Sequence, residues 1–244
     1  MRPHRGSSHR DAASPREQHA GRPPVAVAGD AELEAHASLA AHQLGEAVLL
    51  LAGNLELLRE RSGGAGEAVH GLEAGTERAR RYVDDLLDLL AARQPHEPAA
   101  VDLAAALAAA HDELEPWFAR ARSTLAVGPL PPVSLDPRLA GRLCAHLLRG
   151  TLAAAPPGGL RIDVAAHEED ARVRIEIRDD GEPLSPERAD DLFAAFAPPR
   201  GRGPLVGAGV SAVVCRWIVE GHGGCIGARP GERGAVVAFT LPRR

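Results

Sequence analysis

One histidine near the N-terminus has the surroundings of a reactive group. His42 lies in the stretch Ala41–Val48, where Glu46 follows at i+4 and would share one face of a helix with it. An imidazole nitrogen is a competent nucleophile near neutral pH, because much of the side chain is then unprotonated. His42 also precedes the apolar residue Leu44 by two positions, so it would flank an apolar stripe and face solvent. His42 is therefore a candidate acceptor of a transferred group, and the alternative is an ordinary surface histidine.

Three short motifs follow one another in the C-terminal third of the chain. They are Asp179-Asp180-Gly181, Gly207-Ala208-Gly209 and His222-Gly223-Gly224. A glycine-rich loop that leads into a helix can surround phosphates with backbone N–H groups. Taken alone, these glycines fit a flexible loop and a helix start equally well, so their meaning depends on their order and on the elements around them.

The N-terminal part of the chain is expected to be helical after a tail. Residues 1–30 contain Pro, Gly, Ser, Arg and His without periodicity, which predicts a disordered tail. One helix is predicted from about Ala31 to Arg61 and another from about Glu67 to Arg93, because apolar residues recur at intervals of three and four. On the first helix these residues are Leu44, Val48, Leu51, Leu55 and Leu58. Residues 31–94 should thus form an antiparallel helical hairpin.

Such a hairpin would expose an apolar stripe on both helices, and the stripe needs a partner. A second copy of the chain would complete a four-helix bundle, so we expect a homodimer. The alternative is that the second domain covers the stripe within one chain.

After the linker Gln94–Pro98 the pattern becomes mixed, and residues 99–244 are expected to be one α/β domain. The expected helices cover 103–122, 137–154, 185–196 and 210–221, with Ser185 as an N-cap. The expected strands lie near 124–127, 133–135, 160–166, 172–178, 225–229 and 235–241. The fold class expected for the whole chain is α+β.

From about residue 34 to its end, the chain resembles the histidine kinases of two-component signalling. The stretch around His42 resembles their H-box, and the later motifs resemble the ATPase domain shared with gyrase-type and chaperone-type ATPases. The resemblance implies that His42 is the phosphoacceptor and that Asp179 accepts a hydrogen bond from adenine, with Gly181 letting the base approach. It also implies that Gly207 and Gly209 surround the phosphates of ATP. Residues 99–244 would then form the α/β sandwich of this ATPase type.

The chain departs from the family at positions with specific chemistry. The two asparagine positions of the metal site are His146 and Gly150, and neither suits Mg²⁺, which prefers hard oxygen ligands. The single asparagine, Asn54, lies in the other domain. The acid that normally follows the phosphoacceptor is Gln43, which cannot take a proton. We therefore expect binding of ATP and Mg²⁺ to be weak or lost, and we predict no metal ligands.

Composition limits the remaining choices. A net charge of -5 argues against a nucleic-acid-binding protein. The cysteines Cys144, Cys215 and Cys225 lack metal-type spacing and fit a reduced, cytosolic setting. No apolar run reaches the roughly 18 residues that a membrane span requires. The sequence thus predicts a cytoplasmic protein without a membrane span.

Three functions from different classes fit these features. The first is a histidine-kinase-like signalling protein in which His42 exchanges a phosphoryl group with the receiver domains of response regulators. The second is an active ATP-dependent sensor histidine kinase with divergent motifs. The third is a non-catalytic module that binds a regulator or a true kinase. The expected partners are a receiver domain, a second copy of the chain and a hybrid kinase.

Overall fold

The computed structural model describes residues 44–45, 48–49, 51–53, 55–56, 67–193 and 211–244. His42, Gly207 and Gly209 lie outside the described residues, as does the tail predicted for residues 1–30. The described residues between 44 and 56 are helical, as predicted. The hairpin that residues 31–94 should form is therefore only partly described.

Helix α2 (Glu67–Ala91) is the long helix that leads into the second domain. Val83 on this helix is buried, as are Val48 and Leu55 from the preceding helical residues. Leu44, Leu49, Leu51, Leu72 and Leu86 instead keep large exposed surfaces. The apolar stripe is thus covered in part within one chain, and the rest of it remains open to solvent.

The second domain contains a five-stranded sheet with the strand order β2-β4-β5-β7-β6. Its strands are β2 (Thr124–Val127), β4 (Arg161–Glu169), β5 (Arg172–Asp179), β6 (Ile226–Pro230) and β7 (Ala235–Pro242). Only the β2–β4 pair is parallel among the described strands. A two-residue turn joins β4 to β5, with Asp170 at a φ of 42°, a conformation that aspartate tolerates. A small second sheet pairs β1 (Ala99–Val101) with β3 (Val133–Leu135).

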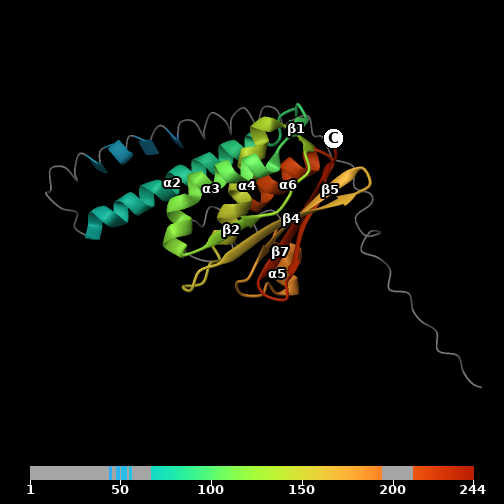
Figure 1. Ribbon diagram of the computed structural model, residues 1–244. Coiled ribbons are helices and arrows are strands. Elements are labelled where there is room, and N and C mark those ends of the chain that lie inside the picture. The colour runs from blue at the N-terminus through green and yellow to red at the C-terminus, as the bar shows by residue number, and fades with distance from the viewer. Residues whose placement is uncertain (1–43, 46–47, 50, 54, 57–66, 194–210) are drawn as a thin grey trace, which may run out of the picture.

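Three helices cover one face of the main sheet (Figure 1): α3 (Leu103–Ala121), α4 (Pro137–Leu152) and α6 (Ser211–Gly221). The core between the layers consists of aliphatic side chains such as Leu143, Leu148, Ile162, Val173, Ile218 and Leu241. The short helix α5 (Pro186–Asp191) packs beside β6 and begins at the predicted N-cap, Ser185. It ends earlier than predicted, because Leu192 and Phe193 already form a turn.

The N-termini of α3 and α4 are each capped by an aspartate. Asp102 accepts hydrogen bonds from the backbone N–H groups of Ala104 and Ala105, and Asp136 accepts one from the N–H of Arg138. These contacts satisfy N–H groups that have no partner inside the helix. They fix where α4 begins, and α4 carries the residues that matter below.

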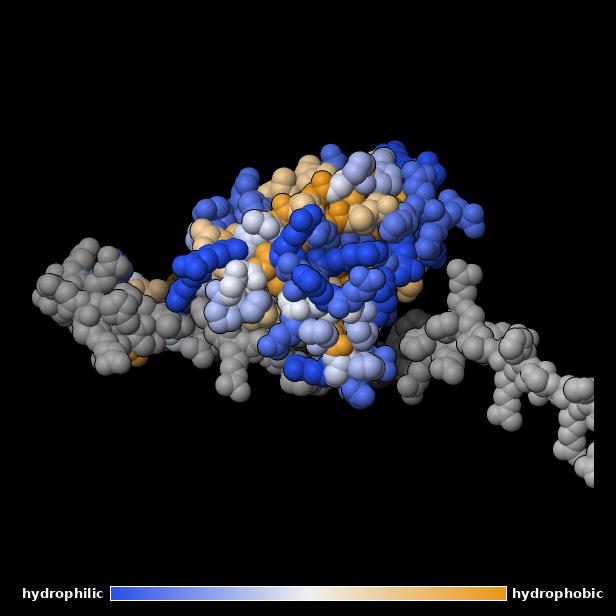
Figure 2. Space-filling view, turned by 60° about the horizontal axis from the view of Figure 1, so that its bottom comes forward, coloured by the Kyte–Doolittle hydropathy of each residue, from blue (hydrophilic) through white to orange (hydrophobic). Residues whose placement is uncertain are grey.

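The face of the sheet opposite the helices is polar. Glu176 on β5 is only 4% exposed and accepts hydrogen bonds from Arg178 and Arg229, with Arg174 in an ion pair at 3.0 Å. Figure 2 shows one face of the molecule, where hydrophilic side chains (blue) spread between patches of hydrophobic ones (orange). Among the described residues, no helix is both long and apolar enough to span a membrane.

Candidate functional site

Asp179 lies at the C-terminal end of β5, where the sequence placed it. Its Oδ1 atom accepts hydrogen bonds from the backbone N–H groups of Gly181 (3.1 Å) and Ala235 (3.2 Å). Gly234 has a φ of 60°, and a Cβ atom there would lie 2.2 Å from the same oxygen. A Cβ atom at Gly181 would lie 2.9 Å from Leu160 Cδ1. Both glycines therefore allow close packing around a buried carboxylate, and the structure joins Asp179 and Gly181 by a hydrogen bond.

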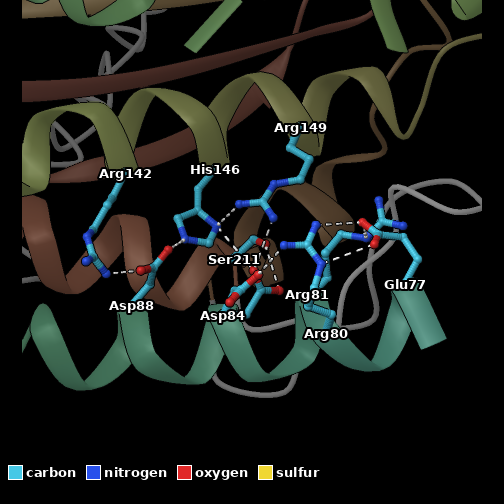
Figure 3. A network of polar contacts seen from close by, with 10 residues as sticks. Glu77, Arg80, Arg81, Asp84, Asp88, Arg142, His146, Arg149 and Ser211 are labelled. Carbon is cyan, nitrogen blue, oxygen red and sulfur yellow. Dashed lines mark hydrogen bonds and ion pairs between the residues drawn. The ribbon is translucent and has the colours of Figure 1, made fainter. Parts of the chain in front are cut away.

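His146 lies on the face of α4 that packs against α2. Its side chain is fully buried, and its Nε2 atom is 2.9 Å from Asp88 Oδ2 (Figure 3). Its Nδ1 atom is 3.2 Å from Arg149 Nη2. Because a guanidinium can only donate, Nδ1 accepts and the proton resides on Nε2, which donates to Asp88. Both ring nitrogens of His146 are thus engaged by neighbouring side chains.

Asp85 is the second carboxylate that α2 directs at α4. It is 1% exposed, and its oxygens lie 3.4 Å from Arg149 Nη1 and 3.5 Å from the hydroxyl of Ser211, the first residue of α6. Burial raises the pKa of Asp85, and the neighbouring guanidinium of Arg149 only partly opposes this. Asp85 therefore connects three helices through one buried carboxylate.

Further cations surround this pair of aspartates. Arg142, one turn before His146 on α4, forms an ion pair with Asp88. Arg81 on α2 is 7% exposed, and its guanidinium lies 5.2 Å from the ring centroid of Trp117 on α3.

Sequence analysis did not predict this network of charged side chains between α2 and α4. The available signal was the spacing of Arg142, His146 and Arg149 at i, i+4 and i+7, which places three basic side chains on one face of α4.

Both ring nitrogens of His222 form hydrogen bonds that hold neighbouring elements together. Its Nε2 atom accepts a hydrogen bond from the backbone N–H of Asp136 (3.0 Å), and its Nδ1 atom donates to the carbonyl oxygen of Ile218 (2.7 Å). The ring also packs against His96 of the linker, with 4.3 Å between the ring centroids. The His222-Gly223-Gly224 motif thus ends α6 and anchors it to the start of α4.

Comparisons with known proteins agree with these observations. Residues 135–244 match the family described as histidine kinase-, DNA gyrase B-, and HSP90-like ATPase. The chain is 31% identical over 133 residues to the sensor protein KdpD of Escherichia coli and 32% identical over 197 residues to the C4-dicarboxylate transport sensor protein DctS of Rhodobacter capsulatus. It is 33% identical over 151 residues to the adaptive-response sensory kinase SasA of Synechococcus sp..

The chain belongs to the two-component sensor histidine kinase family. These alignments cover 54%, 78% and 59% of the chain but only 15%, 28% and 39% of the respective relatives, so the chain spans a minor part of their length. Full-length ShkA in complex with AMPPNP has the same fold, at 22% identity and a TM-score of 0.64 over 86% of this chain and 46% of that chain. The histidine kinase AdeS of Acinetobacter baumannii gives a TM-score of 0.57 at 17% identity, covering 90% of this chain and 100% of that one.

The family resemblance predicts that His146 and Gly150 stand where asparagine oxygens would bind Mg²⁺. The His146 ring is buried and bonded to Asp88 and Arg149, and Gly150 offers no side chain. The described residues contain no cluster of three or more His, Cys, Asp or Glu side chains suited to a metal ion. Arg142 and Arg149 add fixed positive charge on the same helix face. These side chains do not fit Mg²⁺.

Proposed function

We propose that this chain is a two-component signalling protein in which His42 accepts a phosphoryl group from the receiver domain of one response regulator and passes it to another. The observation that carries this proposal is the engagement of His146 by Asp88 and Arg149. A metal position closed in this way disfavours autophosphorylation from Mg-ATP, because phosphoryl transfer depends on neutralising the phosphate charges. The acceptor stretch Ala41–Val48 is retained in the sequence.

The proposed step needs little from the ATPase-type domain. The unprotonated nitrogen of His42 attacks the phosphorus of the receiver's aspartyl phosphate, and an N–P bond forms while the acyl P–O bond breaks. The receiver's carboxylate leaves, and the imidazole returns its N–H proton to solvent. The receiver supplies the metal that this step requires. Gln43 is no obstacle, because an imidazole needs less base assistance against an acyl phosphate than against ATP. A rigid helix helps, since in-line transfer tolerates little misplacement.

Assembly forms a further part of the proposal. Leu44, Leu51 and Leu86 keep exposed apolar surface, which would be covered if a second copy completed a four-helix bundle. A homodimer would place two His42 side chains on one rigid scaffold. Receiver domains are the proposed partners, and a hybrid kinase is the proposed upstream donor.

An active ATP-dependent sensor histidine kinase is the second candidate. One observation favours it: Asp179 keeps its place at the strand end, held by the N–H groups of Gly181 and Ala235. If nucleotide binds there, adenine would meet Asp179 and Gly181, and the phosphates would meet Gly207 and Gly209 of the glycine-rich loop.

The test follows a phosphorylated receiver domain in the presence of the full chain. Wild type should take the labelled phosphoryl group from the receiver onto a histidine, and His42→Gln should abolish this transfer. His167→Gln is the control, because His167 is exposed on β4 and away from the helical region. Incorporation of label directly from ATP would favour the second candidate. Phosphotransfer at His42 would be contradicted if the His42→Gln protein still removed the label from the receiver. It would also be contradicted if wild type removed no label from any receiver in a panel.

A further inference from the structure

The face of the main sheet that lies away from α3, α4 and α6 carries a group of charged side chains (Figure 1). Side chains alternate along β5, so the residues between its buried aliphatic side chains point to this outer face. They are Arg174, Glu176 and Arg178. Arg229 of β6 shares the face, because it pairs with Val236 of β7, which in turn pairs with Arg178. Charged residues of two strands separated by β7 thus gather on one surface.

The buried carboxylate of Glu176 is the centre of this group. Its Oε1 atom lies 3.0 Å from Arg174 Nη2 and 3.4 Å from Arg229 Nη2, and its Oε2 atom accepts a hydrogen bond from Arg178 Nε at 3.1 Å. Among the described residues, the other carboxylate within ion-pair distance of these arginines is Glu169, 3.9 Å from Arg174. Positive charge therefore remains in excess at this place, although the whole chain has a net charge of -5.

The three arginines also have donor groups to spare. A carboxylate accepts about four hydrogen bonds, whereas each guanidinium offers about five N–H donors. The side chains of Arg178 and Arg229 are half-exposed, and within the described part of the chain the Nε–H of Arg174 has no acceptor. A further anion can thus bind to this group while Glu176 keeps its contacts.

A hollow of about 300 Å³ lies beside the arginines, over the pair formed by β6 and β7. Gly227 and Ala238 pair directly and form its floor, and a Cβ atom on Gly227 would meet nothing within 4 Å. Arg229 lines one end of the hollow, and Arg174, which pairs with Thr240, lines the other. Small side chains in the middle row and long ones in the rows on either side therefore create the hollow.

We propose that this hollow, with Arg174, Arg178 and Arg229 around it, is a docking site for an extended acidic segment of a partner protein. The two rows that carry the arginines are four residues apart along the strands, or about 13 Å. Acidic side chains at i and i+4 of an extended segment share one face and have the same separation. The residue at i+2 lies between them, over Gly227 and Ala238, where a small apolar side chain fits. The site thus recognises two carboxylates with an apolar side chain midway.

A segment of a protein suits this site better than a free small molecule does. Sites for small molecules enclose most of the ligand, whereas Cys225, Gly227 and Arg229 are exposed and the hollow is open. A segment needs no enclosure, because the surface of its own protein shields it from water. Charge complementarity then contributes specificity and a high association rate. The inference goes beyond phosphoryl exchange at His42 and does not depend on it.

The test is fluorescence anisotropy of the full chain with a fluorescein-labelled, C-terminally amidated peptide of sequence Glu-Ser-Val-Ser-Glu. Wild type should bind the peptide, and salt should weaken the complex. Arg229→Gln should weaken binding by about tenfold, the usual effect of losing a hydrogen bond between charged groups. Arg120→Gln is the matched control, because it removes the same charge from an exposed position of α3 on the other side of the sheet and should leave the affinity unchanged.

A second variant fills the hollow without changing any charge. Gly227→Val places its side chain in open space, so the chain should fold with an unchanged melting temperature while peptide binding is abolished. Equal affinity of wild type and the Gly227→Val protein would overturn the proposal. The same conclusion would follow if Arg229→Gln and Arg120→Gln affected binding equally.

Further ligands test the chemistry of the partner. Gln-Ser-Val-Ser-Gln lacks both carboxylates, and Glu-Ser-Val-Glu-Ser places them on opposite faces of an extended chain, so each should bind about tenfold more weakly. Free glutamate that bound as tightly as the first peptide would replace the docking site by a small-molecule site. Phosphatidylserine vesicles that bound through Arg229 in place of the peptide would replace it by a membrane contact. Because no arm measures phosphoryl transfer, a failure here is separate from a failure of the His42 proposal.

Discussion

The imidazole of His222 accepts a hydrogen bond from the backbone N–H of Asp136, 86 positions earlier in the chain, at 3.0 Å. The other ring nitrogen donates to Ile218 within the last turn of α6. One side chain thus fixes the end of α6 against the start of α4. Because α4 carries His146 and α6 begins at Ser211, this contact sets the relative position of the two helices that meet Asp85 and Asp88 of α2.

Replacing His222 should destabilise the second domain. His222→Ala leaves the buried N–H of Asp136 and the carbonyl of Ile218 without partners, and each lost partner costs about 1–3 kcal/mol. Urea unfolding should show a lower free energy of unfolding of the same order. His167→Ala, at an exposed position of β4, should change this free energy by less than about 0.5 kcal/mol. Equal stability of the two variants would contradict the anchoring role of His222.

Asp136 should make stability depend on pH in the acid range. The side-chain hydrogen bond from Arg138 holds the pKa of Asp136 well below its ordinary value of 3.8; burial opposes this shift, and the backbone N–H groups of Glu97 and Arg138 add to it. Since the folded pKa is depressed, the unfolded chain binds more protons as the solution is acidified. The contribution of Asp136 is therefore fully present above the unfolded pKa and is lost as pH falls toward the folded pKa.

The measurement compares wild type with Asp136→Asn by urea unfolding from pH 6 down to pH 3. The difference in unfolding free energy should be about 1–3 kcal/mol at pH 6 and should shrink as the pH falls. Asp136→Ala should cost about 1 kcal/mol more at every pH, because it also removes the N-cap of α4. A difference that grows on acidification would contradict this linkage.

Aspartate substitutions at exposed and at buried positions of the apolar stripe should have different effects on assembly and stability. Leu51 is 58% exposed, so Leu51→Asp should leave the chain folded while abolishing a dimer that buries this residue. Val48 is 7% exposed, so Val48→Asp should destabilise the helical region itself, where a buried aliphatic side chain contributes roughly 1.5–3 kcal/mol. Sedimentation and helical circular dichroism separate the two outcomes. A wild-type chain that is monomeric at micromolar concentration would contradict the homodimer.

Gly234 should tolerate no side chain, in contrast to Gly227. A Cβ atom at Gly234 would lie 2.2 Å from the backbone oxygen of Asp179, and its φ of 60° strains any residue with a Cβ atom. Gly234→Ala should therefore cost about 1–3 kcal/mol and disturb Asp179. Gly227→Ala meets nothing within 4 Å and should be nearly neutral. Thermal unfolding of the two variants provides the check, and similar melting temperatures would contradict the tight turn around Asp179.

Sequence by itself determined the features that depend on neighbouring residues. The alternation around residues 161–179 predicted the β4–β5 hairpin, because side chains of a strand alternate between core and solvent. Ser185 was identified as a cap, because its hydroxyl reaches an N–H only three residues ahead. Asp179 follows directly on the strand predicted for residues 172–178, and the order of the motifs indicated the family.

Only the tertiary structure decided what surrounds His146. Its partner Asp88 is 58 positions away, and no local pattern states which helix face will pack on which. The spacing of Arg142, His146 and Arg149 showed a basic face on α4, but a basic face on a helix usually lies in solvent. That face is partly buried here because α2 brings Asp85 and Asp88 against it, and burial of a charge is tolerated only when an opposite charge comes with it.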